Sequence, residues 1–369
     1  MKFVTLFPNT QNVHLLKDLG MIPYYLHKQH GYDSYIVTYE SADGYSYLKT
    51  QVQGLKLEFL KKSHLGKVMD GARYLRKKSK EIDVLNVYHL NLASFIWIPI
   101  YQKRKPKGGK VYLKLDMSYK GLRDCLAKNP IGWIKRKTIQ MADIVSAETT
   151  LIQSELQKVF QKEILYIPNG FSLPTEAEQG LDEKENIILT VGNLGTIEKA
   201  TDTLMEAFAL FSRQKASDWK MRLVGPIAQK FEPFINQFFE KYPGLQDSIV
   251  FIGAITDKVQ LAKEYEAAKI FVLPSRQESF GIVLTEAISR GCYTITATGA
   301  PAGYDVSDKG RLGRIFETDQ VDQLAAAFAE VCAEDVDWNA RALEIKEFAR
   351  QNFLWETIIH RLHQAIMVK

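Results

Sequence analysis

Short apolar runs alternate with longer amphipathic stretches along the whole chain. The short runs are typical of strands, and we predict them at 2–7, 34–39, 84–88, 111–115, 144–147 and 164–167, and again at 187–191, 220–224, 249–252, 270–273 and 294–297. The stretches between them show the helical period, for example over 13–30, 201–213 and 279–290. This alternation indicates parallel sheets built from βαβ units.

A polar segment with little periodicity divides the chain into two halves. Residues 171–185 follow the turn signal PNG at 168–170 and carry Pro and Glu but few apolar residues. We therefore predict an N-terminal domain over 1–170, a linker over 171–185 and a C-terminal domain over 186–350. Two doubly wound domains of this kind leave a cleft between the carboxyl ends of their sheets, where ligands bind. The last helical stretch, 351–369, is predicted to pack back on the first domain.

The composition is that of an ordinary globular protein. The 369 residues are 46% hydrophobic and 25% charged, which excludes collagen-like, disordered and disulfide-scaffold classes. Cys125, Cys292 and Cys332 lie far apart with no CxxC pair, so we expect neither a zinc site nor disulfides. The first apolar run is too short for a signal peptide, and the longest, Ala93–Ile100, is far below the about 20 residues of a membrane span. These features predict a cytoplasmic protein.

The net charge of +5 is unevenly distributed. Residues 1–170 hold 27 Lys and Arg against 14 Asp and Glu, whereas the remaining residues hold 21 against 29. The cations cluster at 61–62, 67–80, 103–107 and 135–137. A solvated surface, an anionic acceptor and the anionic face of a membrane are all compatible with this pattern. Nucleic acid is not expected, because no zinc finger, RNP pattern or helix-turn-helix accompanies the charge.

Two glutamates follow the predicted strand 270–273. Glu278 precedes the next predicted helix, and Glu286 lies about two helical turns later on nearly the same face. Carboxylates accept hydrogen bonds from vicinal hydroxyls, so two of them about 12 Å apart suit the two polyols of a sugar nucleotide. The free amides of 280–282 point to the same ligand. The alternative is a helix-capping acid beside a solvated one.

The segment PSRQESFGIVLTEAISRG at 274–291 resembles the paired-glutamate motif of the retaining glycosyltransferases of family 4. Other segments resemble the same family in the same order: ADIVSAET at 142–149, YIPNGF at 166–171, ILTVGNLGTIEKATDTLMEAF at 188–208, MRLVGP at 221–226, IVFIGAI at 249–255 and ATGAPAGYDVSDKGRLGRIF at 297–316. The likeness covers nearly all of 140–330 and is looser over 1–140. It implies the α/β GT-B fold, with two Rossmann-like doubly wound domains facing a cleft and a C-terminal helix crossing back to the first domain.

The resemblance implies a donor site in the second domain. Its residues are Asn193, Lys199, Gly253, Ile255, Glu278, Ser279, Phe280, Gly281, Ile282 and Glu286. By this likeness, Glu278 contacts the donor sugar and Glu286 the ribose. The backbone of 253–255 passes the base, and the amides of 280–282 bind the sugar and the diphosphate. Lys199 holds the position of the diphosphate-binding lysine, where a cation beside a helix start offsets the charge of the leaving group.

The resemblance also implies reacting groups and an acceptor site. His89 follows the strand 84–88 where the family has a histidine that reaches the reacting sugar, so His89, Lys199 and Glu278 form the implied catalytic set. Asp116, which follows the strand 111–115, is a candidate for binding acceptor hydroxyls. Asn9 and Thr10 are candidates for the acceptor side and for capping the helix that follows them.

Two positions depart from the family pattern. The family usually has an arginine where this chain has Asn193, whose amide donates hydrogen bonds but brings no charge. Arg276, Arg311 and Arg314 are candidates to supply the missing cation. The first loop, 7–12, lacks the glycine pair that lets backbone amides approach a phosphate.

Together these features predict a retaining hexosyltransferase that takes a nucleotide diphosphate sugar, with UDP as the nucleotide, and needs no cofactor. No metal is expected, because the only Asp-x-Asp spelling, 335–337, lies between helices rather than after a strand. The expected acceptor is a glycan or lipid-linked sugar of a cell-surface polysaccharide or glycoconjugate. The basic first domain favours a peripheral position at the inner face of the cell membrane. The alternatives are a non-catalytic GT-B partner subunit of a glycosyltransferase complex and a sugar-nucleotide epimerase.

Overall fold

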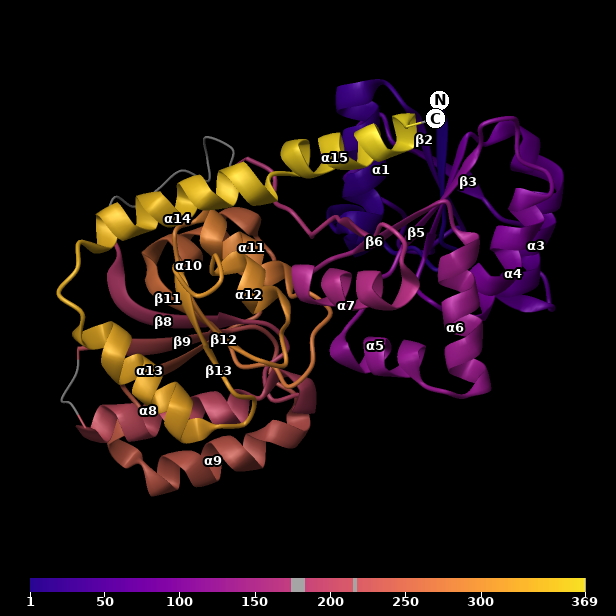
Figure 1. Cartoon of the computed structure of the whole chain (residues 1–369). Coiled ribbons are helices and arrows are strands. Elements are labelled where there is room, and N and C mark those ends of the chain that lie inside the picture. The colour runs from indigo at the N-terminus through magenta and orange to yellow at the C-terminus, as the bar shows by residue number, and fades with distance from the viewer. Residues whose placement is uncertain (174–182, 215–217, 369) are drawn as a thin grey trace. The chain divides into compact units, whose positions relative to one another are not determined.

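A computed structural model describes residues 1–173, 183–214 and 218–368, which form two compact units. The first unit comprises Met1–Gly170 with Trp355–Lys369, and the second comprises Phe171–Leu354. Each unit is a parallel sheet covered by helices (Figure 1). Most of the predicted linker, 174–182, lies outside the described residues. No helix in the described part of the chain is both long and apolar enough to cross a bilayer.

The sheet of the first unit contains seven described strands. They are β1 (Lys2–Leu6), β2 (Asp33–Thr38), β3 (Lys56–Phe59), β4 (Val84–Tyr88), β5 (Lys110–Lys114), β6 (Ile144–Ala147) and β7 (Leu165–Tyr166). Their order is β3-β2-β1-β4-β5-β6-β7, and every neighbouring pair is parallel. The sequence pattern missed β3, because this short edge strand buries none of its residues fully and therefore has no apolar run.

Helices cover both faces of this first sheet. They are η1 (Asn12–Leu16), α1 (Asp18–His30), α2 (Tyr47–Thr50), α3 (Gly66–Lys78), η2 (Ser79–Glu81), α4 (Leu92–Gln102), α5 (Tyr119–Leu126), α6 (Pro130–Met141), α7 (Thr150–Phe160) and α15 (Trp355–Met367). The core on one face is filled from α1 and α15, where Trp355 stacks on Tyr25, and the other from α3, α4 and α6 (Figure 1). The helix predicted over 13–30 is split, because Lys17 is extended.

The sheet of the second unit contains six described strands. They are β8 (Glu185–Val191), β9 (Lys220–Val224), β10 (Ile249–Gly253), β11 (Ala268–Leu273), β12 (Tyr293–Ala297) and β13 (Gly313–Phe316). Their order is β10-β9-β8-β11-β12-β13, and all neighbouring strands are parallel. The sequence pattern also missed the edge strand β13, which is only four residues long and buries just its two ends. Its sequence GRIF has two polar or glycine positions in four.

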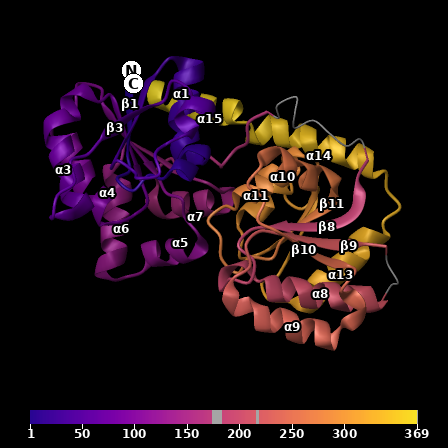
Figure 2. The same cartoon turned by 180° about the vertical axis from the view of Figure 1, so that it is seen from behind.

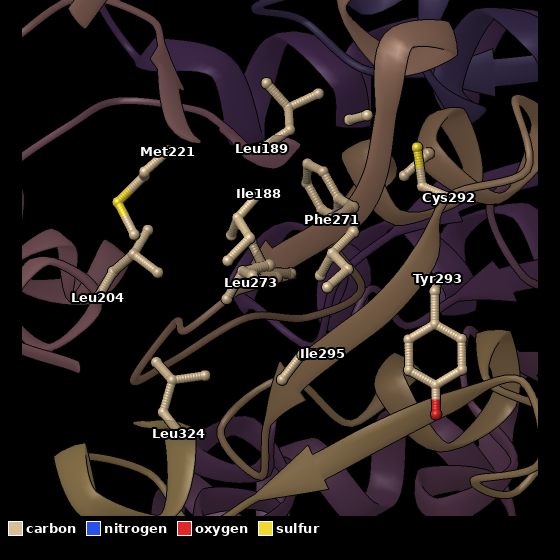
Figure 3. Close-up of a cluster of buried hydrophobic side chains, with 14 of the residues drawn as sticks. Ile188, Leu189, Leu204, Met221, Phe271, Leu273, Cys292, Tyr293, Ile295 and Leu324 are labelled. Atoms are coloured by element: carbon tan, nitrogen blue, oxygen red, sulfur yellow. The ribbon is translucent and has the colours of Figure 1, made fainter. Parts of the chain in front are cut away.

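The helices of the second unit form a layer on each face of its sheet (Figure 2). They are η4 (Ile197–Lys199), α8 (Thr201–Gln214), η5 (Gln229–Phe231), α9 (Glu232–Lys241), η6 (Pro243–Leu245), α10 (Lys258–Ala267), α11 (Ile282–Ser289), α12 (Ala302–Val306), α13 (Val321–Ala333) and α14 (Trp338–Phe353). Figure 3 shows the core, where Ile188 of β8, Phe271 of β11 and Ile295 of β12 lie between helices. Leu204 of α8 and Leu324 of α13 close this core.

Two helix boundaries differ from the sequence prediction. The helix predicted over 279–290 begins only at Ile282, because Gly281 has a left-handed φ of 86° that ends the preceding loop. The C-terminal helical stretch is divided at Leu354, whose extended backbone separates α14 from α15. As a result, α14 belongs to the second unit and only Trp355 onward belongs to the first.

Candidate functional site

The loops that follow β8 and β11 carry the predicted donor-side residues Lys199 and Glu278. These strands are neighbours in the sheet. Because the carboxyl ends of parallel strands share one edge, the two loops lie beside each other. The Lys199 ammonium donates a hydrogen bond to Glu278 Oε1, and the two side chains are 27% and 15% exposed. The pair is thus formed at the surface of the edge, where a ligand can reach both partners.

Arg276 fastens these two loops together. Its backbone amide donates to the Glu198 carbonyl at 2.8 Å, and its guanidinium donates to the Ile197 carbonyl at 2.8 Å. The guanidinium also pairs with Asp202 at 2.8 Å and with Asp319 at 2.6 Å. Arg276 is therefore a structural tie that fixes η4, and hence Lys199, against the loop that bears Glu278.

The arginines considered as substitutes for a cation at position 193 are all engaged with carboxylates. Arg276 has the two partners just described. Arg311 pairs with Asp308 at 2.6 Å and also with Glu344, and Arg314 lies 3.8 Å from Glu334. The suggestion that one of them replaces the missing cation is therefore not supported by their contacts.

Close backbone contacts shape the loop around Glu278. The Glu278 amide donates to the Gly299 carbonyl at 3.1 Å. A Cβ atom at Gly299 would lie 2.4 Å from the Ser275 carbonyl oxygen, so only glycine fits this position. Phe280 is buried in the core and anchors the loop from beneath. The Leu284 amide donates to the Gly281 carbonyl at 2.9 Å, whereas the amides of Ile282 and Val283 at the start of α11 precede any acceptor within the helix and can meet a ligand.

Glu286 is held by a tyrosine from the neighbouring helix. It lies on α11, and its Oε2 accepts a hydrogen bond from the Tyr265 hydroxyl of α10 at 2.8 Å. Burial raises the pKa of Glu286, against the opposing effect of the Tyr265 hydrogen bond. One carboxylate oxygen of Glu286 is therefore already occupied within the protein, and its contact with a ribose stays a prediction.

The remaining donor-side residues are spread along the same edge. Asn193 is exposed in the loop after β8 and shares with Lys199 the lining of a small pocket of about 10 Å³. Gly253 ends β10, two strands from β8, with Ile255 just beyond it. The Gly225 amide donates to the Gly253 carbonyl at 2.8 Å. Ser279 is partly buried in the loop after β11. The structure thus brings Asn193, Lys199 and Glu278 together and places 253–255 further along the edge.

In the first unit, His89 and Asp116 follow the neighbouring strands β4 and β5. His89 Nδ1 lies 3.8 Å from Asp116 Oδ2, and both side chains are partly exposed. Both residues have a left-handed backbone, with φ of 63° and 44°. This conformation is strained for residues other than glycine and costs on the order of 1–3 kcal/mol each. The surrounding structure must therefore hold the two side chains in this arrangement.

A buried charge cluster, which the sequence reasoning missed, lies behind these two residues. The Lys114 ammonium, which is not exposed at all, donates to Glu148 Oε1 at 2.9 Å and to the Ile167 carbonyl at 3.0 Å. Glu148 Oε2 accepts the Met117 amide at 3.0 Å. Since Met117 follows Asp116 directly, Glu148 fixes the turn that carries Asp116. A lysine within the apolar strand VYLKL was the sequence signal for this cluster.

Asp18, at the start of α1, completes the buried cluster. Its Oδ2 lies 3.8 Å from the Lys114 ammonium. Burial raises the pKa of Asp18 to about 6, against the opposing effect of Lys114. Burial lowers the pKa of Lys114, but the carboxylates of Glu148 and Asp18 outweigh it and hold that pKa above its usual value. The cluster therefore places the buried Lys114 ammonium between the carboxyl groups of Glu148 and Asp18.

The first loop is organised by its own hydrogen bonds. Thr10 is buried, and its hydroxyl donates to the Phe7 carbonyl at 2.7 Å. Asn9 is exposed. The suggestion that one of these two residues caps the next helix is wrong, because Gln11 directly precedes η1 and its amide donates to His14 Nδ1 at 3.0 Å. Thr10 is thus engaged within the loop, and an acceptor contact of either residue stays a prediction.

The Asp-x-Asp spelling near the C-terminus has a structural role. Asp337 accepts hydrogen bonds from the amides of Asn339 and Ala340 at 2.9 and 3.0 Å. It therefore caps the start of α14.

Residues 174–351 match the family model described as glycosyl transferases group 1, a span that lies within the second unit. The D-inositol 3-phosphate glycosyltransferase of Rhodococcus opacus is 29% identical over 183 residues, which cover 49% of this chain and 40% of that protein. The mannosylfructose-phosphate synthase of Agrobacterium fabrum is 31% identical over 113 residues, 30% of this chain and 24% of that protein. The chain thus spans less than half the length of either relative.

Solved structures resemble the chain over nearly its whole length. The sucrose-phosphate synthase from Thermosynechococcus elongatus matches with a TM-score of 0.74 and 17% identity over 98% of this chain and 97% of that one. Anabaena HepE in complex with UDP matches with a TM-score of 0.73 and 16% identity over 99% of each chain. These matches confirm the predicted GT-B fold. Together with the family match over the second unit, they support a GT-B glycosyltransferase.

Proposed function

We propose that this protein transfers a hexosyl unit from a UDP-linked sugar to a glycan or lipid-linked acceptor, with retention of configuration and without a metal ion. The observation that carries the proposal is the Lys199–Glu278 pair, formed between two neighbouring loops at the carboxyl edge of the second sheet. The group 1 match over the same unit supports it. So do similar solved structures that contain UDP and UDP-glucose.

When a donor binds, Glu278 and Lys199 can separate, Glu278 contacting the sugar and Lys199 the diphosphate. Glu278 exchanges its lysine partner for hydroxyls of the sugar, because a carboxylate accepts hydrogen bonds from either. Lys199 then offsets the charge that develops on the diphosphate as the bond between the anomeric carbon and the phosphate oxygen breaks. The amides at the start of α11 bind the same phosphates.

In the proposed reaction the new bond forms on the same face of the sugar. The acceptor oxygen bonds to the anomeric carbon, and its proton passes to the departing phosphate oxygen. No protein nucleophile is invoked in this step. In this proposal His89 reaches the reacting sugar and Asp116 serves the acceptor side, and the buried pair of Lys114 and Glu148 fixes the turn that carries Asp116.

The acceptor is proposed to be anionic or held at a membrane. Residues 1–170 carry 27 Lys and Arg against 14 Asp and Glu. Such an excess of positive charge attracts anionic polymers and the anionic inner face of a cell membrane. Synthesis of a cell-surface polysaccharide or glycoconjugate at the inner face of the membrane is consistent with this excess of positive charge.

A donor screen tests the proposal most directly. Purified protein is incubated with each candidate nucleotide sugar, and nucleotide release is measured. Lys199→Ala and Glu278→Ala are expected to lower kcat/KM at least about tenfold, or about 1.4 kcal/mol. Lys241→Ala is the matched control, because it removes another lysine–glutamate pair of the same unit, on α9. Wild-type turnover by both site variants would reject the assigned roles.

A non-catalytic partner subunit is the second candidate function. Asn193 brings no charge, and the three candidate arginines, Arg276, Arg311 and Arg314, are bound to carboxylates. Such a subunit would bind UDP without releasing sugar from any donor. A rise in melting temperature with UDP, together with no nucleotide release across the whole screen, would favour this function.

A further inference from the structure

Five large apolar side chains are exposed at the carboxyl edge of the first sheet. They are Phe59, Leu65, Leu92, Ile131 and Trp133, with exposed fractions between 49% and 63%. Phe59 ends β3, and the others lie at the starts of α3, α4 and α6. Because the sheet is parallel, these helices begin at the edge where its strands end. We call these five residues the apolar rim.

Contacts hold together the three helices whose starts carry four of the rim residues. The ring of Phe95 on α4 packs edge-on against Trp133 of α6, with centroids 6.2 Å apart. The Trp97 indole of α4 donates to the Val68 carbonyl of α3 at 2.8 Å. The helices α3, α4 and α6 lie side by side in both views (Figures 1 and 2). Single exposed apolar residues are ordinary, but a contiguous group of them marks an interaction surface.

The two segments that carry four of the five rim residues are strongly basic, and of the acids that border them Asp70 is buried and Asp116 is one-third exposed. The segments 59–69 and 117–137 hold these exposed basic residues: Lys61, Lys62, Lys67, Lys120, Arg123, Lys128 and Lys137. Their one acidic residue, Asp124, is already paired with Lys135 at 3.2 Å. A protein partner would have to be both apolar and strongly acidic to match this surface. An anionic lipid bilayer offers both properties at its interface.

We propose that the apolar rim docks on an anionic membrane, with Ile131 and Trp133 entering the headgroup region. Tryptophan suits this depth because its ring is apolar and its indole nitrogen donates to polar groups. The same sheet edge carries His89 and Asp116, so docking presents the acceptor side to lipid-linked molecules. That last consequence rests on the proposed function, whereas the docking itself does not.

The tryptophans of this chain provide a direct test. Of the five in the sequence, Trp133 is the exposed one, whereas Trp97, Trp219 and Trp355 are buried and Trp338 is partly buried. A blue shift of the emission on adding vesicles therefore reports on Trp133. We expect this shift with vesicles of phosphatidylcholine and phosphatidylglycerol, and none with phosphatidylcholine alone. Trp133→Phe should still bind but lose the shift.

Cosedimentation with the same vesicles measures binding itself. The double variant I131S/W133S is expected to lower the partition coefficient at least about tenfold, because it removes most of the apolar area that enters the membrane. Leu343→Ser on α14 is the matched control, since Leu343 is 67% exposed but belongs to the second unit, and it should bind normally. Raising the salt to about 1 M, where the Debye length is about 3 Å, should release the wild-type protein.

Several outcomes would overturn the proposal. Equal binding to neutral vesicles would contradict the electrostatic contribution to docking. Binding without an emission shift would contradict the entry of the apolar rim into the membrane. Equal losses for L343S and I131S/W133S would show that the rim has no special role. The same emission shift with heparin or DNA would point to a polyanion instead of a bilayer. Failure of every donor to release nucleotide would contradict the proposed function but leave these vesicle results unchanged.

Discussion

Both units place a lysine–glutamate pair at the carboxyl edge of a sheet, but the two pairs differ in their access to water. Lys199 and Glu278 are partly exposed and come from two loops. Lys114 and Glu148 are fully buried and come from the ends of neighbouring strands. An exposed pair adds little to stability, whereas removing one partner of a buried pair is strongly destabilising.

The hydrogen bonds of each pair agree with this difference. Lys114 also donates to a backbone carbonyl, and Glu148 uses its second oxygen for the Met117 amide, so the buried pair is satisfied within the protein. Glu278 binds only one lysine through one oxygen in the described contacts. The comparison teaches that the buried pair, Lys114 and Glu148, fixes the backbone around it. The pair of Lys199 and Glu278 can instead exchange partners when a ligand binds.

The largest expected effect comes from breaking the buried pair. Lys114→Met leaves Glu148 charged and without its cation in the core, so the free energy of unfolding should fall by about 3–5 kcal/mol. Calorimetry should show this as a lower transition temperature of the first unit. The double variant K114M/E148L should regain only part of the loss, because it removes the Glu148 charge but leaves the Asp18 carboxyl and the Met117 amide without their partners. A destabilisation of less than about 1 kcal/mol by K114M would contradict the assigned burial.

The next effect depends on pH and concerns Asp18. Because its pKa in the folded protein is raised to about 6, ionisation of Asp18 opposes folding, and its contribution to stability declines as pH rises from about 4 to about 6. Asp18→Asn should therefore stabilise the protein by about 3 kcal/mol at pH 8 and change little at pH 4. Melting temperatures across this range measure the difference.

Asp33 provides a control for the direction in which stability changes with pH. The Lys56 hydrogen bond lowers the pKa of Asp33, so its ionisation favours folding. Asp33→Asn should lose stability as pH rises, the opposite direction to D18N. A gain for D18N that is the same at pH 4 and pH 8 would refute the role of Asp18 ionisation.

A smaller effect concerns backbone strain beside the exposed pair. Ala200 follows Lys199 with a left-handed φ of 50°. Ala200→Gly relieves about 1 kcal/mol of strain, but it also removes a fully buried methyl group worth about 0.8 kcal/mol, so we expect no net gain in stability. Gln161→Gly, at a φ of 48° after α7, is the control, and because Gln161 is exposed the same relief should appear there as a net gain of about 0.5 kcal/mol. Lower nucleotide release for A200G alone would show that Ala200 holds Lys199 in place.

The smallest effect on stability is expected for the exposed pair itself. Lys199→Met should change the free energy of unfolding by less than about 1 kcal/mol, because solvent replaces the lost partner. Chemical denaturation measures this directly. A loss comparable with that of K114M would mean that the two pairs are equivalent, and the comparison would fail.

The fold could be predicted because its central strands are apolar runs. Strands β1, β4, β8 and β11 are buried on both faces, so their sequences are apolar runs that predict strands. The edge strands β3 and β13 are short and partly exposed, and carry no such signal. The helical stretches that began late or were interrupted did so at Gly281, Lys17 and Leu354, where the backbone conformation of one residue outweighed the helical period.

The candidate site could be predicted only where its residues lie in segments that resemble a family motif. Glu278 and Lys199 followed from a family resemblance, and the structure pairs them across 79 residues. The partnership of Glu286 with Tyr265 and of Lys114 with Glu148 joins side chains 21 and 34 residues apart. The sequence around one residue of such a pair does not indicate its partner, because the contact exists only once the strands and helices are packed.

The return of α15 to the first unit has a practical consequence. A fragment that stops at Gly170 would leave the face of α1 around Tyr25 uncovered, since Trp355 packs there. The two chain ends lie near each other in both views, and the Lys110 ammonium at the start of β5 binds the Val368 carbonyl (Figures 1 and 2). Circular permutation, with a short peptide joining the ends and new termini opened after Gly170, would therefore turn the first unit into one uninterrupted stretch that can be produced alone.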